Sequence, residues 1–135
     1  MALPIRSDDL GKLMLRLTLG ALMLFHGTSK LMHPAATLSY TSGQLANLGL
    51  PGFIGYGVFL GEVLAPLMII FGVFSRIGGL IVAINMVFAI MLVHSAQIFT
   101  LGKSGGWALE LQGFYLMTAF ALLFLGSGRA AIRPD

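Results

Sequence analysis

The sequence predicts an all-α fold in which four helices cross a membrane as one bundle. Of its 135 residues, 57% are hydrophobic and only 10% are charged, whereas soluble domains average roughly 25% charged residues. The mean hydropathy is +0.92, and a chain this apolar could not hide its hydrophobic surface inside a small water-soluble core. Four apolar stretches have about the length that crosses a hydrocarbon layer, and the chain length suits a single domain over residues 1–135.

The first half of the chain contains two of these spans. The first covers about residues 12–32, enough to cross roughly 30 Å of hydrocarbon, and a His-Pro pair ends it. Residues 35–51 form a connection that is either a short interfacial helix or an ordered loop folded over the end of the bundle. The second span covers about residues 53–74, and Pro66 within it is expected to kink the helix or to free a carbonyl.

The second half contains the other two spans. A very short turn at Ser75-Arg76 makes the second span an antiparallel neighbour of the third, which covers about residues 77–96. A glycine-rich loop leads to the fourth span, about residues 107–125, where Trp107 fits an interfacial anchor. Four spans place both termini on one side of the membrane.

The distribution of basic residues predicts which side this is. One basic residue, Lys103, lies clearly in the loops opposite the termini. Five other basic residues, outside the spans or at the first residue of one, lie on the side of the termini: Arg6, Lys12, Arg76, Arg129 and Arg133. Cytoplasmic loops of membrane proteins carry an excess of Lys and Arg, so we expect both termini to be cytoplasmic.

Composition excludes several classes of function. The chain has no cysteine, which excludes disulfides, thiol redox chemistry on this chain and cysteine-ligated metal or haem. It has no Lys/Arg cluster with interleaved aromatic residues, so nucleic-acid binding is not expected. Residues of metal-ligand type come from separate helices without a short-range spacing motif, so no metal site is predicted.

Ionisable side chains gather in the half of the bundle opposite the termini. His26 and Lys30 are four residues apart and therefore share one face of the first span. Glu62 lies in the second span, His94 near the end of the third and Glu110 near the start of the fourth. Buried charges in lipid need partners, so Lys30 is expected to pair with Glu62 or Glu110.

This polar layer has two interpretations. It either locks the helices together through ion pairs and hydrogen bonds, or forms an outward-facing pocket that could hold a quinone head group, relay protons or bind a metal. In the second case Glu62, His26 and Glu110 are the catalytic candidates. The candidate cofactor-binding residues are His26, Lys30, Glu62, His94 and Glu110. Outside the layer, Arg16 is expected to extend to the inner head groups and Asn85 to join two helices.

The order and spacing of several short motifs resemble the DoxX family of small four-helix membrane proteins over nearly the whole chain. The motifs are Arg16-Leu-Thr-Leu-Gly20, Gly27-Thr-Ser-Lys30-Leu31, Gly49-Leu-Pro51, Glu62, Gly72-Val-Phe-Ser-Arg76, His94-Ser95, Gly105-Gly106-Trp107-Ala-Leu-Glu110 and Gly126-Ser-Gly128-Arg129. The family takes its name from a subunit of a thiosulfate:quinone oxidoreductase. The resemblance therefore implies a multi-pass protein of the bacterial inner membrane with a quinone-linked redox role.

Three functions follow as hypotheses. The first is a redox subunit that binds a diffusible quinone and works with a partner protein, because a chain without cysteine or a cofactor motif cannot store electrons itself. The second is a non-enzymatic adaptor that contacts a partner through residues 35–51, with the polar layer purely structural. The third is a small-solute or proton carrier, which four helices would support only as an oligomer. The bilayer is the expected surrounding, and a homodimer is compatible with the sequence.

Overall fold

The computed structural model describes residues 7–135 and confirms an all-α protein. Arg6, which contributes to the charge argument, lies outside the described residues. No β-strand occurs in residues 7–135, where two isolated bridges are the only extended pairing. The α-helices, in chain order, are α1 (Asp8–Met32), α2 (Pro34–Asn47), α3 (Gly57–Phe59), α4 (Ala65–Phe71), α5 (Ser75–Val93) and α6 (Glu110–Leu125). Short 3-10 turns cover Gly52–Tyr56 and Ser95–Gln97, and a π-helical turn covers Leu60–Leu64.

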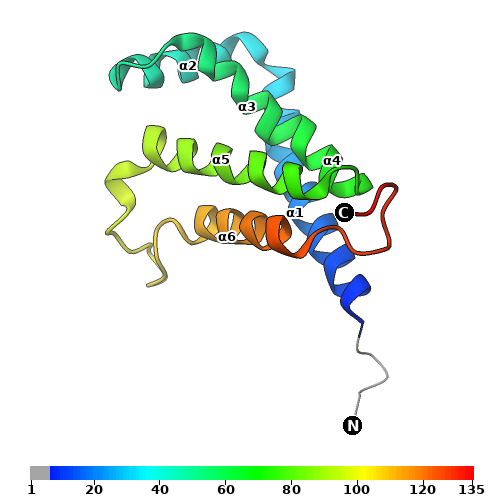
Figure 1. The fold of residues 1–135 in the computed structure, drawn as a ribbon. Coiled ribbons are helices and arrows are strands. Elements are labelled where there is room, and N and C mark those ends of the chain that lie inside the picture. Colours follow the sequence, from blue (N-terminus) through cyan, green and yellow to red (C-terminus); the bar gives the residue numbers. More distant parts are fainter. Residues whose placement is uncertain (1–6) are drawn as a thin grey trace.

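The core lies where α1, α4, α5 and α6 meet. The antiparallel helices α5 and α6 lie side by side, and α1 crosses them diagonally (Figure 1). The core is apolar and contains small residues where helices come close together. Its buried members are Leu19, Met23, Ala65, Ile69, Val82, Ala83, Met86, Tyr115, Ala119 and Leu122.

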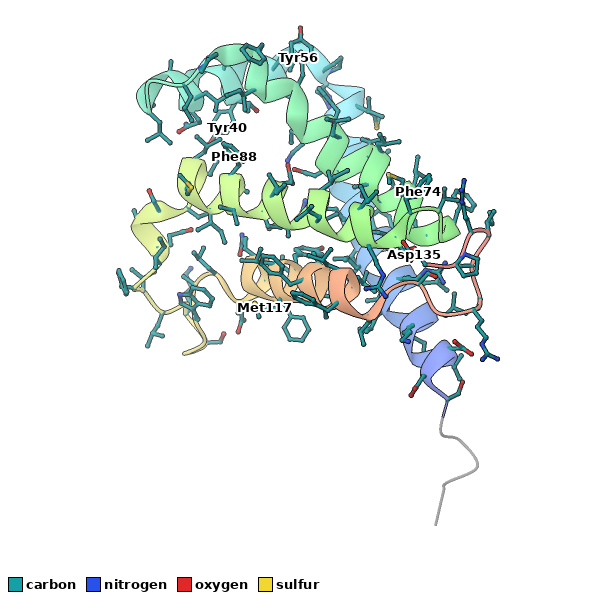
Figure 2. The ribbon with its side chains drawn as sticks, in the orientation of Figure 1. Tyr40, Tyr56, Phe74, Phe88, Met117 and Asp135 are labelled. Carbon is teal, nitrogen blue, oxygen red and sulfur yellow. The ribbon has the colours of Figure 1, made fainter. Side chains whose placement is uncertain are left out.

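The outside of the bundle is also apolar, as expected for a protein surrounded by lipid. Phe25, Phe114 and Phe124 are 74%, 76% and 76% exposed, and Met117 projects away from the bundle (Figure 2). Two helical stretches, Gly52–Phe71 and Ser75–Val93, are long and apolar enough to cross a membrane, whereas Glu110–Leu125 is apolar but shorter. The helices predicted over 12–32, 53–74, 77–96 and 107–125 are present with shifted ends.

The connection after the first helix is helical, which decides between the two alternatives for residues 35–51. The helix α2 starts at Pro34, where the fixed φ of proline suits a first helical position. It lies over the far end of α5 (Figure 1). Leu45 is buried, whereas most of the remaining residues of α2 are partly or fully exposed. The helix therefore covers one end of the bundle.

The expectation for Arg16 is wrong. The side chain is 1% exposed and does not extend to the membrane surface. Its guanidinium donates to four carbonyl oxygens: Ile69 at 2.9 Å, Ile70 at 3.1 Å, Ser127 at 3.1 Å and Ala130 at 2.6 Å. The first two belong to the last turn of α4, where carbonyls have no partner within the helix and the helix dipole favours a cation.

The C-terminal segment folds back over the same end of the bundle. Ile132 and Arg133 donate backbone hydrogen bonds to Phe71 and Gly72 at 3.0 and 2.9 Å. Asp135 accepts from the backbone N–H of Arg76 at 3.0 Å, and Figure 2 shows it beside the start of α5. The tail and Arg16 together close the end that carries the termini.

Candidate functional site

The site is built around Glu62, which lies in the π-helical turn Leu60–Leu64. In an α-helix the carbonyl of Glu62 would accept from the residue four positions on, but that residue is Pro66, which has no N–H. Pro66 was expected to kink the helix or to free a carbonyl, and the structure shows a locally widened π-helical turn before it. Such widened turns frequently occur at functional sites. The side chain of Glu62 is 7% exposed, so its charge requires partners.

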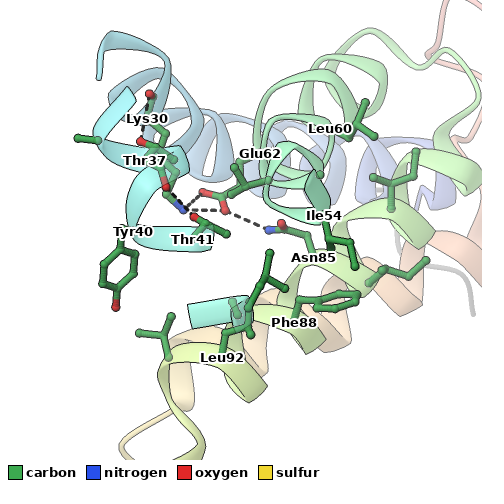
Figure 3. A pocket seen from close by; sticks show the side chains of 18 residues that line it. Lys30, Thr37, Tyr40, Thr41, Ile54, Leu60, Glu62, Asn85, Phe88 and Leu92 are labelled. Carbon is green, nitrogen blue, oxygen red and sulfur yellow. Dashed lines mark hydrogen bonds and ion pairs between the residues drawn. The ribbon is translucent and has the colours of Figure 1, made fainter. Parts of the chain in front are cut away.

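Two residues from other helices supply these partners. Lys30 Nζ, from the last turn of α1, lies 2.7 Å from Glu62 Oε1 and 2.8 Å from Oε2. Asn85 Nδ2, from the middle of α5, donates to Oε2 at 3.1 Å (Figure 3). Of the two partners predicted for Lys30, the structure selects Glu62. Asn85 joins two helices as predicted, and it does so through the carboxylate of the site.

A cavity of about 590 Å³ opens beside these three residues. It lies between α2 and α5, and α3 and the π-helical turn form its third wall (Figure 3). Lys30, Glu62 and Asn85 provide polar groups in a wall that is otherwise mostly apolar. The apolar lining includes Leu45, Ile54, Ile81, Ile84, Phe88 and Leu92. A mostly apolar cavity with a few convergent polar groups is typical of a small-molecule site.

The threonines that α2 contributes to the cavity add little polarity. Thr37 Oγ1 donates to the His33 carbonyl at 2.8 Å, and Thr41 Oγ1 donates to the Thr37 carbonyl at 2.8 Å. An ammonium has three N–H groups and an amide has two. Lys30 and Asn85 therefore retain hydrogen-bonding capacity beyond their bonds to Glu62, and a bound molecule could use it.

Three predicted site residues lie elsewhere. His26 is exposed and makes an edge-to-face contact with the ring of Tyr115 at 6.1 Å between centroids. His94 follows α5, and its Nδ1 lies 2.8 Å from Gln97 Oε1. Glu110 is exposed at the first position of α6. None of the three lines the cavity, so the structure brings together two of the five residues of the polar layer.

Asn85 is a member of the site that was not predicted from the sequence. Its signal was present, because an amide in the middle of an apolar span needs a partner and Glu62 lies at a comparable depth. For metals, residues 7–135 contain no group of three or more His, Asp or Glu side chains that could hold an ion.

The ion pair itself leads to a stability prediction. Replacing Lys30 by Met leaves Glu62 buried with only Asn85, and we expect the free energy of unfolding to fall by about 2 kcal/mol, between the ranges for exposed and buried pairs. The double variant Lys30→Met/Glu62→Gln removes both charges and should regain part of this loss. Thermal unfolding of the single and double variants measures the coupling; independent, additive effects would contradict an ion pair.

Fold and site define a small all-α protein with an apolar outer surface and a Lys–Glu ion pair, its carboxylate buried, beside a largely apolar cavity. Comparison with known proteins gives its family: the DoxX model matches residues 11–95, which include Lys30, Glu62 and Asn85. The chain belongs to the DoxX family. It is 28% identical over 129 residues to a Bacillus subtilis protein named "Putative oxidoreductase CatD", covering 96% of this chain and 89% of that one.

A second relative has no assigned activity. An uncharacterized protein of Haemophilus influenzae is 28% identical over 121 residues, covering 87% of this chain and 84% of the relative. No solved structure matches the chain significantly.

Proposed function

We propose that this DoxX protein crosses the bacterial inner membrane with four helical segments, both termini in the cytoplasm, and acts as a quinone-linked redox subunit. The observation that carries the proposal is the buried carboxylate of Glu62, bonded to Lys30 and Asn85 at the wall of a largely apolar cavity. The oxidoreductase name of the Bacillus subtilis relative supports a redox role. The quinone is the substrate, and it is exchanged with the surrounding membrane.

A quinone suits the donors that the cavity offers. Its head group presents carbonyl oxygens, which accept hydrogen bonds, and the rest of the molecule is apolar. Lys30 and Asn85 have N–H groups beyond those bonded to Glu62. The volume of about 590 Å³ falls within the range of roughly 300–1,000 Å³ typical of small-molecule sites. Phe88 and the aliphatic lining would contact the ring and the apolar substituents.

The chemistry assigned to the chain is proton handling. Reduction of a quinone to a quinol consumes two electrons and two protons. Because the chain has no cysteine, a partner protein with its own redox centre supplies the electrons. Lys30 transfers a proton to the reduced oxygen. Glu62, which contacts Lys30 directly, takes up a proton from water and passes it to the deprotonated Lys30, and a second round of the same transfer supplies the second proton.

The two carboxylates of the polar layer allow a direct test. Glu62→Gln removes the charge at the cavity, whereas Glu110→Gln removes an exposed charge outside it. We expect Glu62→Gln to lower quinone-dependent turnover in membranes about 100-fold, the scale of lost general acid–base catalysis. Native mass spectrometry of protein released gently from these membranes should show bound quinone in Glu110→Gln and none in Glu62→Gln.

The adaptor hypothesis gives the opposite pattern. In it the Lys30–Glu62 pair only locks α1 to the π-helical turn, and the observation in its favour is that both carboxylate oxygens are already hydrogen bonded. Glu62→Gln would then lower stability without affecting any quinone signal. A wild-type protein that carries only phospholipid, together with unchanged turnover in Glu62→Gln membranes, would refute the quinone proposal.

A further inference from the structure

The segment between α5 and α6 contains a small hairpin, residues 97–108, that the site does not use. The bridge between Leu101 and Trp107 pairs its two arms. Ala108 N donates to the Thr100 carbonyl at 3.0 Å, and Gly102 N donates to the Gly106 carbonyl at 2.6 Å. A turn at Gly102–Gly106 closes the hairpin, and the first arm follows the 3-10 turn Ser95–Gln97. The segment is therefore an ordered element at the end of the bundle opposite the termini (Figure 1).

The hairpin presents large apolar side chains to its surroundings. Phe99 is 98% exposed, Leu101 is 73% exposed and Trp107 is 41% exposed. Lys103, in the turn, is exposed as well. Such a surface would be unfavourable in water, since three large apolar groups are exposed on so short a segment.

Several polar groups of the hairpin bond within it. Trp107 Nε1 donates to the Ile98 carbonyl at 2.7 Å. Thr100 Oγ1 and Thr100 N both donate to the Gln97 carbonyl, at 2.9 and 3.1 Å. Irregular backbone is tolerated next to lipid only when its hydrogen bonds are made internally. The hairpin thus combines exposed apolar side chains with a partly bonded backbone, a combination suited to the interfacial layer, where water still reaches the remaining polar groups.

The length of α6 indicates what surrounds the hairpin. Arg76, at the start of α5, donates to the carbonyls of Leu123 and Phe124 near the end of α6. The start of α5 and the end of α6 therefore lie at the same depth, at the end of the bundle that carries the termini. With 16 residues, α6 extends about 24 Å, short of the roughly 30 Å of a hydrocarbon core. The hairpin that precedes α6 therefore begins at a depth where acyl chains still meet the head groups.

We propose that residues 97–108 insert into the interfacial layer of the bilayer and complete the span that α6 leaves short. Phe99, Leu101 and the ring of Trp107 contact the upper acyl chains, while Lys103 reaches the lipid phosphates. The partner of this surface is the bilayer itself and not a second protein. This inference is independent of the quinone site, because none of these residues lines the cavity.

Trp107 is the only tryptophan of the chain, so intrinsic fluorescence reports on the hairpin alone. The full-length protein is reconstituted into phosphatidylcholine–phosphatidylglycerol vesicles that contain phosphatidylcholine brominated at a shallow or a deep acyl position. We expect shallow bromines to quench Trp107 about twofold more than deep ones, as for an interfacial tryptophan. Iodide in the aqueous phase should quench it weakly.

A variant at an equally exposed apolar position outside the hairpin provides the control for a hairpin variant. Replacing Phe99 and Leu101 by Ser should raise quenching by iodide about twofold, because the hairpin leaves the acyl layer. Ile132 is also 73% exposed but lies in the C-terminal segment, and Ile132→Ser should leave Trp107 unchanged. Strong iodide quenching of the wild type without bromine quenching would overturn the proposal. Bromine quenching that appears only when the protein is diluted in the bilayer would also overturn it. Such a result would mean that a second copy of the chain covers the hairpin at higher protein density.

Discussion

Replacing Arg16 by methionine is expected to lower the free energy of unfolding by about 4 kcal/mol, the scale of leaving buried polar partners uncompensated. The guanidinium bonds to the end of α4 through Ile69 and Ile70 and to the C-terminal segment through Ser127 and Ala130. Methionine fills a similar volume but donates nothing, so four carbonyls lose their donor. The measurement is thermal unfolding in detergent, followed by circular dichroism, with an expected fall in Tm of about 10 °C or more.

Two further variants make this result specific. Arg129→Met removes an equal charge from an exposed position in the C-terminal segment and should shift the Tm by little. Arg16→Lys keeps the charge but not the planar set of donors, and it should recover only part of the loss. If Arg16→Met were as stable as Arg129→Met, the hydrogen bonds of the guanidinium would not hold this end of the bundle together.

Arg16 also shows where sequence reasoning ends. A cation in an apolar helix near a membrane surface fits an extended side chain that reaches the head groups. What reverses this expectation is the return of the C-terminal segment, whose carbonyls come from residues 111 and 114 positions further along the chain. Hydropathy and charge patterns describe local segments and hold no information about such a distant contact.

The helices themselves were predictable because each follows from a long apolar run. The ends of α1 and α5 lie within a few residues of their predicted positions. The helix α2 was one of two alternatives, since its residues are neither strongly periodic nor strongly apolar and its order depends on packing near Leu45. The break within the second span followed from Pro66, although its form as a π-helical turn did not.

The polar site was predicted in part, for a geometric reason. The position of a residue along a span sets its depth, and His26, Glu62, His94 and Glu110 were grouped on depth alone. Depth does not fix the direction in which a side chain points around the axis of the bundle. Only Lys30 and Glu62 share both depth and direction. The roles predicted for the other three residues stay predictions.

Glycine at position 27 is the second position where a small change should have a large effect. Gly27 is buried on α1 where that helix crosses the π-helical turn, and a Cβ there would overlap the carbonyl group of Glu62. The obstacle is backbone and cannot move aside as a flexible side chain could. We expect Gly27→Ala to lower the free energy of unfolding by about 3 kcal/mol, at the upper end of typical overpacking, and to displace Glu62 from Lys30.

The same helix contains the matched control. Gly11 also lies in α1, but a Cβ there would meet nothing within 4 Å. Gly11→Ala should be neutral or stabilise the protein by up to about 1 kcal/mol, because alanine favours the helix over glycine. Thermal unfolding of both variants, with native mass spectrometry to detect the proposed quinone, gives a joint test. We expect Gly27→Ala to lower the Tm and to abolish the quinone signal, because close contact between α1 and the π-helical turn positions the carboxylate of Glu62. Gly11→Ala should change neither. Equal stability of the two variants would show that the helices do not approach at Gly27, and the position of Glu62 beside Lys30 would then require another explanation.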